Sequence, residues 1–415
     1  MKIESGHNNG EYFCIDMKRC RLVRGIRGAA LYDLEGGAVI PLPPSCVAHL
    51  HESIDCFRVF RELSPEAKVF VESLAVKGLG CFSASLPERN AEKRPETGCR
   101  PDFAWLEITR RCNLSCGHCY GSFGPSPEPQ HVLTDEQWVQ VLTQVKQCGF
   151  DRIQFIGGEP LLHPALPEML FEAGQHRFAF VEVFSNLLLL DDTLLNAVCA
   201  NHARLATTLY SVHEDVHDQV TGRRGSFSST VQRIRRAREW GIPVRVSCVV
   251  SNRNEGRIGD LKSFVEDLGV VYGGQDQSRP SGRGQAAACR TTIPRRMVWP
   301  PFFSNHTKFA EALQFNPCWK GKIAVTDDGS VLPCVFSREC VAGNILTQPL
   351  SDMLSLDDGM KQYWHLNKDR IDVCRDCEFR YGCYDCRPLA RGWGDGQLTA
   401  RTFGCSYDPY SGRWR

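Results

Sequence analysis

Three cysteines fall close together in the segment CNLSCGHCY. They are Cys112, Cys116 and Cys119, separated by three and then by two residues. A four-iron, four-sulfur cube normally takes four cysteine thiolates. Three closely spaced cysteines can therefore hold three irons and leave the fourth open for a ligand with chemistry of its own.

Zinc is the main alternative at this segment. A structural zinc site takes four ligands, usually supplied as two spaced pairs. His118 is a candidate fourth ligand, but it is adjacent to Cys119 and would strain a tetrahedral site. The spacing therefore favours an iron–sulfur cluster over zinc.

Composition bounds the protein's class and location. The chain has 415 residues, 21 cysteines and a formal net charge of +1, which argues against a nucleic-acid binder that works through a basic field. The opening MKIESGHNNGEYF lacks the pattern of a signal peptide, and no run of about 18 apolar residues is present. We therefore expect a cytoplasmic protein without a membrane partner, in which clustered cysteines serve metal binding or catalysis rather than disulfides.

Strand and helix patterns alternate from residue 102 onward and must position these cysteines. The strand candidates are FAWLEIT, DRIQFIGG, FAFVEVFSN, ARLATTLYSV, PVRVSCVVSN and VVYGG. Helical patterns separate them, the first opened by a capping box from Thr134 to Gln137. Six strands alternating with helices predict an α/β fold with a parallel sheet or barrel, and a site at the strands' C-terminal ends.

Chemistry-bearing residues follow three successive strands. The three cysteines come after the first strand, GGEP (from Gly157) after the second, and Ser185–Asn186 end the third. Carboxyl ends of parallel strands meet on one face, so we expect these groups to lie together. A carboxylate at Glu159 suits a bound ammonium group, and glycines let the backbone approach closely.

These residues resemble the signature of radical S-adenosylmethionine (radical SAM) enzymes. The resemblance implies a partial (β/α)6 TIM-like barrel over 102–290, with a [4Fe-4S] cluster on Cys112, Cys116 and Cys119. In that family S-adenosylmethionine chelates the open iron and yields a 5′-deoxyadenosyl radical that abstracts hydrogen. The implied cofactor-binding residues are Gly157, Gly158, Glu159, Ser185, Asn186, Ser211 and Arg223. For the last four, turn and cap functions are the alternative.

After about residue 290, cysteine, glycine and turn residues replace the strand–helix pattern. Such a composition is expected where metal rather than a large core holds a domain together. Residues 300–415 resemble the SPASM domain through Cys318, Cys334, Cys374, Cys377, Cys383, Cys386 and Cys405. The segment CYDC departs from the family spacing, having two residues between its cysteines instead of three.

The SPASM resemblance implies two auxiliary clusters, making three [4Fe-4S] clusters in all. By family precedent Cys374, Cys377, Cys383 and Cys405 hold one, and Cys318, Cys334 and Cys386 belong to the other. The second of these lacks a clear fourth ligand. Cys340, Cys289 or an open iron are the possibilities.

Residues 1–95 predict a separate module and linker. GAALYDLEGGAVIPLP predicts a strand pair, and Ser64 begins a helix, which suggests a winged-helix-like module before a polar linker at 86–101. The module resembles leader-peptide recognition modules of enzymes that mature ribosomally made peptides. The opening sequence also resembles maturases of grasp-with-SPASM systems. A cap over the barrel is the alternative.

We therefore expect an oxidoreductase-type radical SAM enzyme that installs a C–C or C–S cross-link in a ribosomally made precursor peptide. The implied partners are that peptide, with its leader on the N-terminal module, and a flavodoxin or ferredoxin-type electron donor. A maturase of a folded protein, as in sulfatase maturation, and a non-catalytic iron–sulfur or zinc peptide-binding protein are the alternatives. No catalytic acid or base stands out, but Asp276, Arg279 and Arg283 are candidate substrate contacts.

Overall fold

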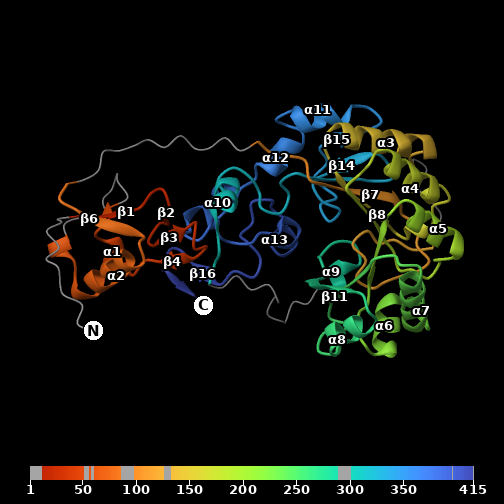
Figure 1. The fold of residues 1–415 in the computed structure, drawn as a ribbon, viewed down its shortest axis with the longest axis horizontal. Helices are drawn as coiled ribbons and strands as arrows, with labels where there is room; N and C mark the ends of the chain where they lie inside the picture. The colour runs from red at the N-terminus through yellow and green to blue at the C-terminus, as the bar shows by residue number, and fades with distance from the viewer. Residues whose placement is uncertain are drawn as a thin grey trace.

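The computed structural model describes residues 12–50, 56–57, 60–85, 98–125, 132–287, 301–394 and 396–414. The N-terminal elements lie at one end of the molecule and the strand–helix unit at the other, with most C-terminal elements between them (Figure 1). None of the helices in these ranges combines the length and apolar character needed to span a bilayer. Most of the predicted linker at 86–101 lies outside the described residues.

A nine-stranded sheet forms the centre of the strand–helix unit. Its strands are β7 (Phe103–Thr109), β8 (Arg152–Gly157), β9 (Phe180–Phe184), β10 (Arg204–Thr208), β11 (Val244–Val250), β12 (Val271–Gln277), β13 (Lys322–Val325), β14 (Ser330–Leu332) and β15 (Gly343–Asn344). Strands β7 to β12 pair in parallel and in chain order. The predicted α/β class and mostly parallel sheet are therefore confirmed, whereas the size of the barrel stays a prediction.

The sheet continues beyond β7 into the C-terminal region. Strand β13 pairs with β7 in parallel, and β14 and β15 follow antiparallel. The sequence did not predict this continuation. It ties the cysteine-rich region directly to the strand that precedes Cys112.

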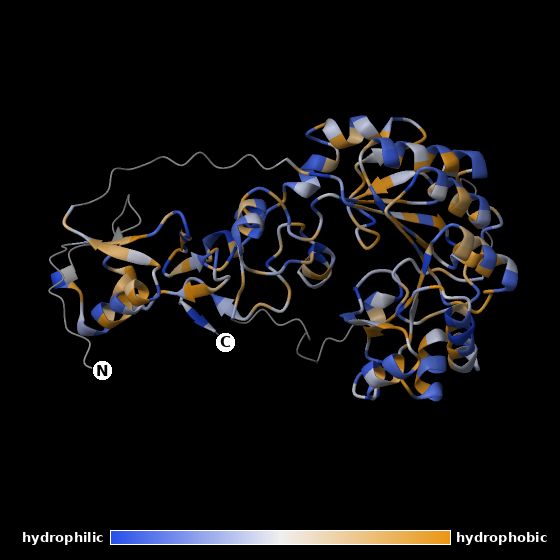
Figure 2. Cartoon of the chain, viewed as in Figure 1, coloured by the Kyte–Doolittle hydropathy of each residue, from blue (hydrophilic) through white to orange (hydrophobic). Residues whose placement is uncertain are grey.

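Helices cover the outer side of the sheet (Figure 1). They are α3 (Asp135–Gln147), α4 (Leu166–Gln175), α5 (Asp192–Ala200), α6 (Glu214–Thr221), α7 (Ser226–Glu239) and α8 (Leu261–Asp267). The short α9 (Gly284–Ala287) follows β12 and lies near the backbone of His118 instead. The capping box at Thr134 and Gln137 is present, and the apolar face of α3, including Trp138, is buried. Hydrophobic residues predominate in strand β7, whereas the helices carry many hydrophilic residues (Figure 2).

The C-terminal region consists of short elements joined by turns. They are α10 (His306–Ala312), α11 (Leu350–Ser355), α12 (Met360–Trp364), α13 (Arg387–Trp393), β16 (Tyr407–Asp408) and β17 (Arg413–Trp414), with 3-10 turns at Lys368–Arg370 and Cys374–Asp376. Short elements bury little apolar area each, so the region depends on side-chain networks and on what its cysteines bind.

The N-terminal module has two three-stranded antiparallel sheets, ordered β5-β1-β6 and β2-β3-β4. Its elements are β1 (Tyr12–Ile15), β2 (Cys20–Arg24), β3 (Ala29–Asp33), β4 (Val39–Pro41), α1 (Pro44–Val47), β5 (Cys56–Phe57), α2 (Pro65–Val76) and β6 (Gly80–Ser83). The predicted strand pair is β3 and β4, and β2 adds an unpredicted third strand. Ser64 caps α2 as expected, its Oγ accepting from Ala67 N. The winged-helix description stays a prediction.

One sheet of the module shares a core with the C-terminal region. The buried Tyr32 on β3 donates its hydroxyl to Glu378 O at 2.9 Å, and its ring centroid lies 5.1 Å from that of Phe309. The outer edge of β4 also receives backbone contacts, because Val39 N donates to Phe302 O at 3.2 Å. The module is therefore packed onto the C-terminal region rather than tethered beside it.

Candidate active site

The loop after β7 carries the thiols of Cys112, Cys116 and Cys119, called the loop thiols below. Backbone N–H groups point at two of them: Leu114 N lies 3.4 Å from Cys112 Sγ, and Phe123 N lies 3.3 Å from Cys119 Sγ. Such N–H groups stabilise sulfur that carries negative charge. The loop is therefore shaped to present thiolates.

Free thiolates would not be stable in this position. Burial raises the pKa of Cys112 and of Cys116 to about 12, and the neighbouring thiols add repulsion. A bound cationic group would remove that conflict, since metal binding takes thiols in their deprotonated form. Among the described residues, no group of three His, Cys, Asp or Glu side chains is placed to hold a single metal ion. A cube makes a different demand, because each thiolate bonds a different iron.

The two glycines of GGEP pack against the backbone that leads into Cys112. A Cβ on Gly157 would lie 2.3 Å from Thr109 O, and one on Gly158 would lie 2.1 Å from Arg111 O. Gly158 N also donates to Thr109 O at 2.7 Å. Only glycine permits this approach. The motif therefore fixes the start of the cysteine loop as well as lining the space beside it.

Glu159 is fully buried and organises the end of β9. Its Oε1 accepts from Ser185 Oγ at 2.6 Å, and its Oε2 accepts from Asn186 N at 2.8 Å. Asn186 Nδ2 in turn donates to Asn113 Oδ1 at 2.7 Å, next to Cys112. Burial raises the pKa of Glu159 to about 7, although these hydrogen bonds oppose the shift. The Glu159 carboxyl group therefore holds Ser185 and Asn186, which follow β9, next to the cysteine loop.

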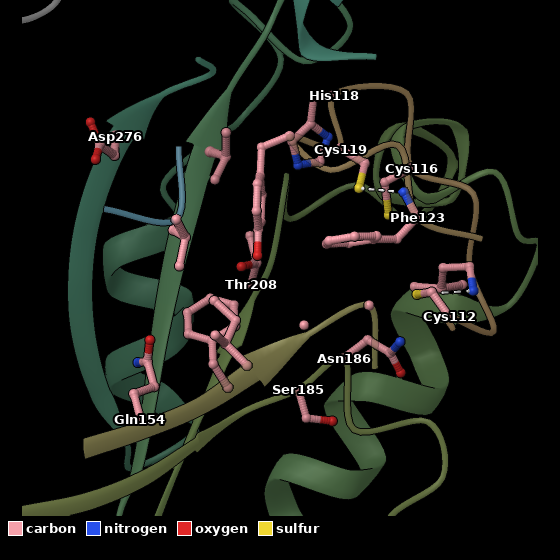
Figure 3. Close-up of a pocket in the computed structure, with 18 of the residues that line it drawn as sticks. Cys112, Cys116, His118, Cys119, Phe123, Gln154, Ser185, Asn186, Thr208 and Asp276 are labelled. Atoms are coloured by element: carbon pink, nitrogen blue, oxygen red, sulfur yellow. Dashed lines mark hydrogen bonds between the residues drawn. The ribbon is translucent and has the colours of Figure 1, made fainter. Parts of the chain in front are cut away.

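Most of the implied cofactor-binding residues meet at one cavity of about 550 Å³. Its walls include the loop thiols and Gly157, Gly158, Ser185 and Asn186. The loop thiols lie on one side of this main cavity, and Gln154 and Asp276 lie across from them (Figure 3). The main cavity is large enough for a ligand of cofactor size.

Ser211 and Arg223 are placed elsewhere. The buried Ser211 donates its hydroxyl to Arg257 O at 2.5 Å and accepts from His213 N. Arg223 is exposed in the turn between α6 and α7. Neither side chain lines the main cavity. Their placement fits the turn and cap functions that the sequence left as the alternative.

Sequence reasoning missed a polar layer on the inner face of the sheet. Glu182, which is 3% exposed, accepts from Arg245 Nη2 at 2.7 Å and from Gln154 Nε2 at 2.5 Å. All three side chains line the main cavity. The available signal was a polar residue with apolar residues on both sides within a strand, as in RIQFI and FVEVF. Side chains alternate between faces, so such a residue either points into a cavity or pairs with a partner.

The segment after β12 contributes a second polar wall. Arg279 donates from Nη2 to Asp276 Oδ2 at 2.9 Å, and its guanidinium lies 5.0 Å from the ring centroid of Phe336. Ser278 Oγ and Arg279 Nε are buried without a hydrogen-bond partner among the described residues. Arg283 also lines the main cavity and donates from Nε to the Cys116 carbonyl at 2.8 Å. The three candidate substrate contacts from the sequence therefore all reach this cavity.

Four C-terminal cysteines line a second, much smaller cavity of about 20 Å³. This second C-terminal set comprises Cys374, Cys377, Cys383 and Cys405. Phe379 N donates to Cys377 Sγ at 3.4 Å, and Cys374 Sγ lies 3.5 Å from the hydroxyl of Thr402. Burial raises the pKa of Cys383 to about 12. Four thiols around one small space fit a fully ligated cluster.

The first C-terminal set comprises Cys318, Cys334 and Cys386. Burial raises the pKa of Cys318 to about 11, and the nearby Cys386 adds repulsion. Val335 and Phe336, next to Cys334, line the main cavity, so this set borders it. The charged groups that act on Cys340 are Glu339 and Arg391 rather than these cysteines. Cys289 lies outside the described residues.

Two family models match the chain. Residues 106–265 match the radical SAM superfamily, and residues 318–378 match the iron–sulfur cluster-binding SPASM domain. The first match contains the loop thiols and GGEP, and the second contains four of the C-terminal cysteines of the two sets. A radical SAM domain implies S-adenosylmethionine and a [4Fe-4S] cluster, and a SPASM domain implies additional iron–sulfur binding.

Several curated proteins are similar in sequence. The antilisterial bacteriocin subtilosin biosynthesis protein AlbA of Bacillus subtilis (strain 168) is 28% identical, over 68% of this chain and 67% of AlbA. The sporulation killing factor maturation protein SkfB of the same strain is 32% identical, over 61% of this chain and 64% of SkfB. The chain thus spans about two thirds of the length of these two relatives.

Solved structures show the same fold. SuiB of Streptococcus suis bound to its precursor peptide SuiA has a TM-score of 0.54 and 14% identity, covering 91% of this chain and 96% of SuiB. The enzyme anSMEcpe with bound AdoMet has a TM-score of 0.54 and 15% identity, covering 73% of this chain and 94% of that chain. The chain therefore carries a radical SAM domain followed by a SPASM domain, the combination found in the radical SAM/SPASM maturases of ribosomally made peptides, which it resembles.

Proposed function

We propose that the chain is a radical SAM enzyme that abstracts hydrogen from a ribosomally made precursor peptide and installs a C–C or C–S cross-link. The carrying observation is that the loop thiols line the main cavity together with Phe336 and Arg279, two residues that adjoin the first C-terminal set. A peptide segment in this space would lie beside the loop thiols and next to the residues that cover the first C-terminal set. The names of AlbA and SkfB, and the peptide in the SuiB structure, support a peptide substrate.

The loop thiols would hold the cluster that binds S-adenosylmethionine. When bound, that pair supplies a 5′-deoxyadenosyl radical as the hydrogen-abstracting species. Gly157 and Gly158 leave room beside the thiols, and Ser185 and Asn186 line the same space. Glu159 keeps the latter two residues in place through its hydrogen bonds. Ser211 and Arg223 have no part in this proposal because they do not line the main cavity.

The wall formed by Ser278 and Arg279 would hold the reacting peptide segment. Both residues are at least nine-tenths buried, and each has a donor atom without a partner in the described part of the chain. A buried donor without a partner is costly, so a ligand acceptor is the natural complement. A peptide carbonyl oxygen has the required chemistry. The wall lies beside Phe336.

The two C-terminal sets would hold auxiliary clusters, making three [4Fe-4S] clusters in all. The first set supplies three thiols, so a fourth position is left for a peptide thiolate, for Cys340, or for electron transfer without a ligand. Thiolate binding would orient a peptide cysteine for capture by a carbon radical and give a thioether. Because Cys340 interacts with Glu339 and Arg391, we favour an open position.

A substitution at Cys340 tests the open position. Cys340→Ala should leave the iron content and the cluster spectra unchanged. Adding precursor peptide should then perturb those spectra only when the peptide contains its cysteine. Loss of one cluster in Cys340→Ala would show that the position is closed, and the thiolate idea would be abandoned.

The N-terminal module would bind the leader of the peptide, and a flavodoxin or ferredoxin-type protein would supply electrons. Strand addition near 28–41 is restricted, because β3 is the inner strand of its sheet and Phe302 occupies part of the outer edge of β4. Arg380 Nη1 donates to the Arg24 carbonyl on β2 at 2.9 Å, so of these two sheets we propose the outer edge of β6 for an added strand.

The experiment that tests this function uses a candidate precursor peptide, sought among small open reading frames beside the gene. Anaerobically reconstituted protein, S-adenosylmethionine and a reductant should convert that peptide to a product that has lost two hydrogen atoms, as a cross-link requires. Tandem mass spectrometry locates the new bond. Cleavage of S-adenosylmethionine with no change in the peptide would contradict a peptide substrate and favour a folded one.

A further inference from the structure

A buried ion network lies between the two C-terminal cysteine sets. Its charged members are Lys368, Asp385 and Arg387, which are 2%, 1% and 0% exposed. Asp385 lies in the segment CYDC, between Cys383 of the second set and Cys386 of the first. Asp385 therefore lies on the short segment that joins a cysteine of one set to a cysteine of the other.

On the side of the first set, Asp385 acts through an amide. Asn316 Nδ2 donates to Asp385 Oδ2 at 2.9 Å, and Asn316 Oδ1 accepts from the backbone N of Cys318 at 3.0 Å. Asn316 is fully buried. The carboxylate is thus one side chain away from the backbone of a first-set cysteine.

On the side of the second set, the contact runs through lysine and threonine. Lys368 Nζ lies 3.5 Å from Asp385 Oδ1 and donates to the Thr402 hydroxyl, which lies 3.5 Å from Cys374 Sγ. Lys368 Nζ also donates to the carbonyl of Tyr384 at 3.1 Å. A continuous chain of polar contacts therefore joins the two sets.

The charges of the network do not cancel. Arg387 donates to Asp385 Oδ1, and its Nη1 donates to the carbonyls of Leu398 and Ala400 at 3.0 and 2.7 Å. Two cations and one carboxylate leave one buried positive charge. Burying such groups costs free energy that apolar residues would avoid. A neighbouring anion, such as a cluster bound by thiolates, would offset that cost.

We propose that the Lys368–Asp385–Arg387 network sets the reduction potentials of the two auxiliary clusters. Reduction adds one negative charge to a cluster, so a nearby cation favours the reduced form and a nearby carboxylate opposes it. A unit charge within roughly 10 Å, at an effective dielectric constant of about 20, changes such an equilibrium at least tenfold. These are positioning residues, because they act on clusters held by other side chains.

Two substitutions of opposite sign test the proposal. Lys368→Met should make the cluster on the second set at least tenfold harder to reduce, a shift of about 59 mV for one electron. Asp385→Asn should make both auxiliary clusters easier to reduce. Lys368→Arg keeps the charge and should stay near the wild-type potential. Lys361→Met, at a partly exposed residue on α12, is the matched control and should shift nothing.

The measurement is a redox titration of the full-length reconstituted protein in which electron paramagnetic resonance monitors the reduction of each cluster. The iron content of each variant is measured in parallel. Shifts of the same sign in Lys368→Met and Asp385→Asn, or no shift in either, would overturn the proposal. Loss of auxiliary iron in both variants would also overturn it, because the network would then be needed for folding. The inference rests on the proposed clusters. Failure of the wild-type C-terminal sets to load iron would instead contradict the proposed function.

Discussion

Glu159 shows how one buried carboxyl group can organise a site without lining it. It accepts hydrogen bonds from Ser185 and from the backbone of Asn186, and both residues line the main cavity. Burial favours the neutral carboxylic acid, whereas these donors favour the carboxylate. The balance places its pKa at about 7, against an ordinary value of 4.5. Glu159 therefore titrates near neutral pH.

The pH dependence of the protein should reflect that shift. Between pH 4.5 and about 7 the folded state holds a proton on Glu159 that the unfolded chain releases. The stabilising contribution of the protonated Glu159 to the free energy of unfolding is therefore complete below pH 4.5. It falls as the pH rises to about 7 and is constant above that pH. Relative to Glu159→Gln, the free energy of unfolding of the wild type should fall by about 3 kcal/mol across this pH range. Infrared titration should show a protonated carboxyl band that disappears near pH 7 and is missing from the variant. Identical titrations for the two proteins would show that the carboxyl is already ionised.

Gly158 tests the contact between GGEP and the cysteine loop. Gly158→Ala places a methyl group 2.1 Å from the Arg111 carbonyl, so the start of the loop must move. Overpacking of this kind costs about 1–3 kcal/mol, and we expect loss of the iron held by the loop thiols. Gly98→Ala is the matched control, since its methyl group would meet nothing within 4 Å. Iron analysis and absorption spectra decide the matter, and full iron retention in Gly158→Ala would show that the loop does not depend on this contact.

At the scale of elements, strands with several apolar residues of their own could be predicted from the sequence. Short strands that form on an edge supplied by a distant segment could not. Strands β7 to β11 contain several apolar residues each, β12 begins within the short run VVY, helical patterns separate the strands, and the structure has them in that order. Strands β13 to β15 have only two to four residues each, too few for a pattern, and they form because β7 offers an edge. The same reasoning explains the site. Motifs that directly follow strands were found, whereas Ser211 and Arg223 depended on analogy and lie away from the cavity.

The packing of the N-terminal sheet on the C-terminal region gives a prediction at this scale. Tyr32→Phe removes only the hydrogen bond to the Glu378 carbonyl and should cost about 1 kcal/mol. Tyr32→Ala also removes the ring from a core shared with Phe309 and should cost about 3–5 kcal/mol.

Thermal unfolding of the reconstituted protein would rank the two variants. Equal, small effects would mean that the module is only loosely attached. The same contacts imply that deleting residues 1–95 would expose apolar surface on the C-terminal region. Point substitutions are therefore the cleaner test of leader binding.

At the scale of the whole molecule, one sheet connects the loop thiols with the cysteine-rich C-terminal region. Strand β7 leads into the loop thiols on one side and pairs with β13 of the cysteine-rich region on the other. Arg338 from that region reaches the buried Glu107 on β7, which also accepts from Tyr120 Oη at 3.0 Å. The loop thiols and the first C-terminal set are thus held on a common framework around the main cavity.

Removing the loop thiols alone tests most directly whether they hold the cluster that cleaves S-adenosylmethionine. In anaerobically reconstituted wild-type protein we expect about twelve irons per chain, if each cluster is a four-iron cube, and reductive cleavage of S-adenosylmethionine to 5′-deoxyadenosine. The variant with Cys112→Ala, Cys116→Ala and Cys119→Ala should keep about two thirds of that iron and cleave no S-adenosylmethionine. Undiminished cleavage in the triple variant, or wild-type protein that contains mainly zinc, would contradict the account.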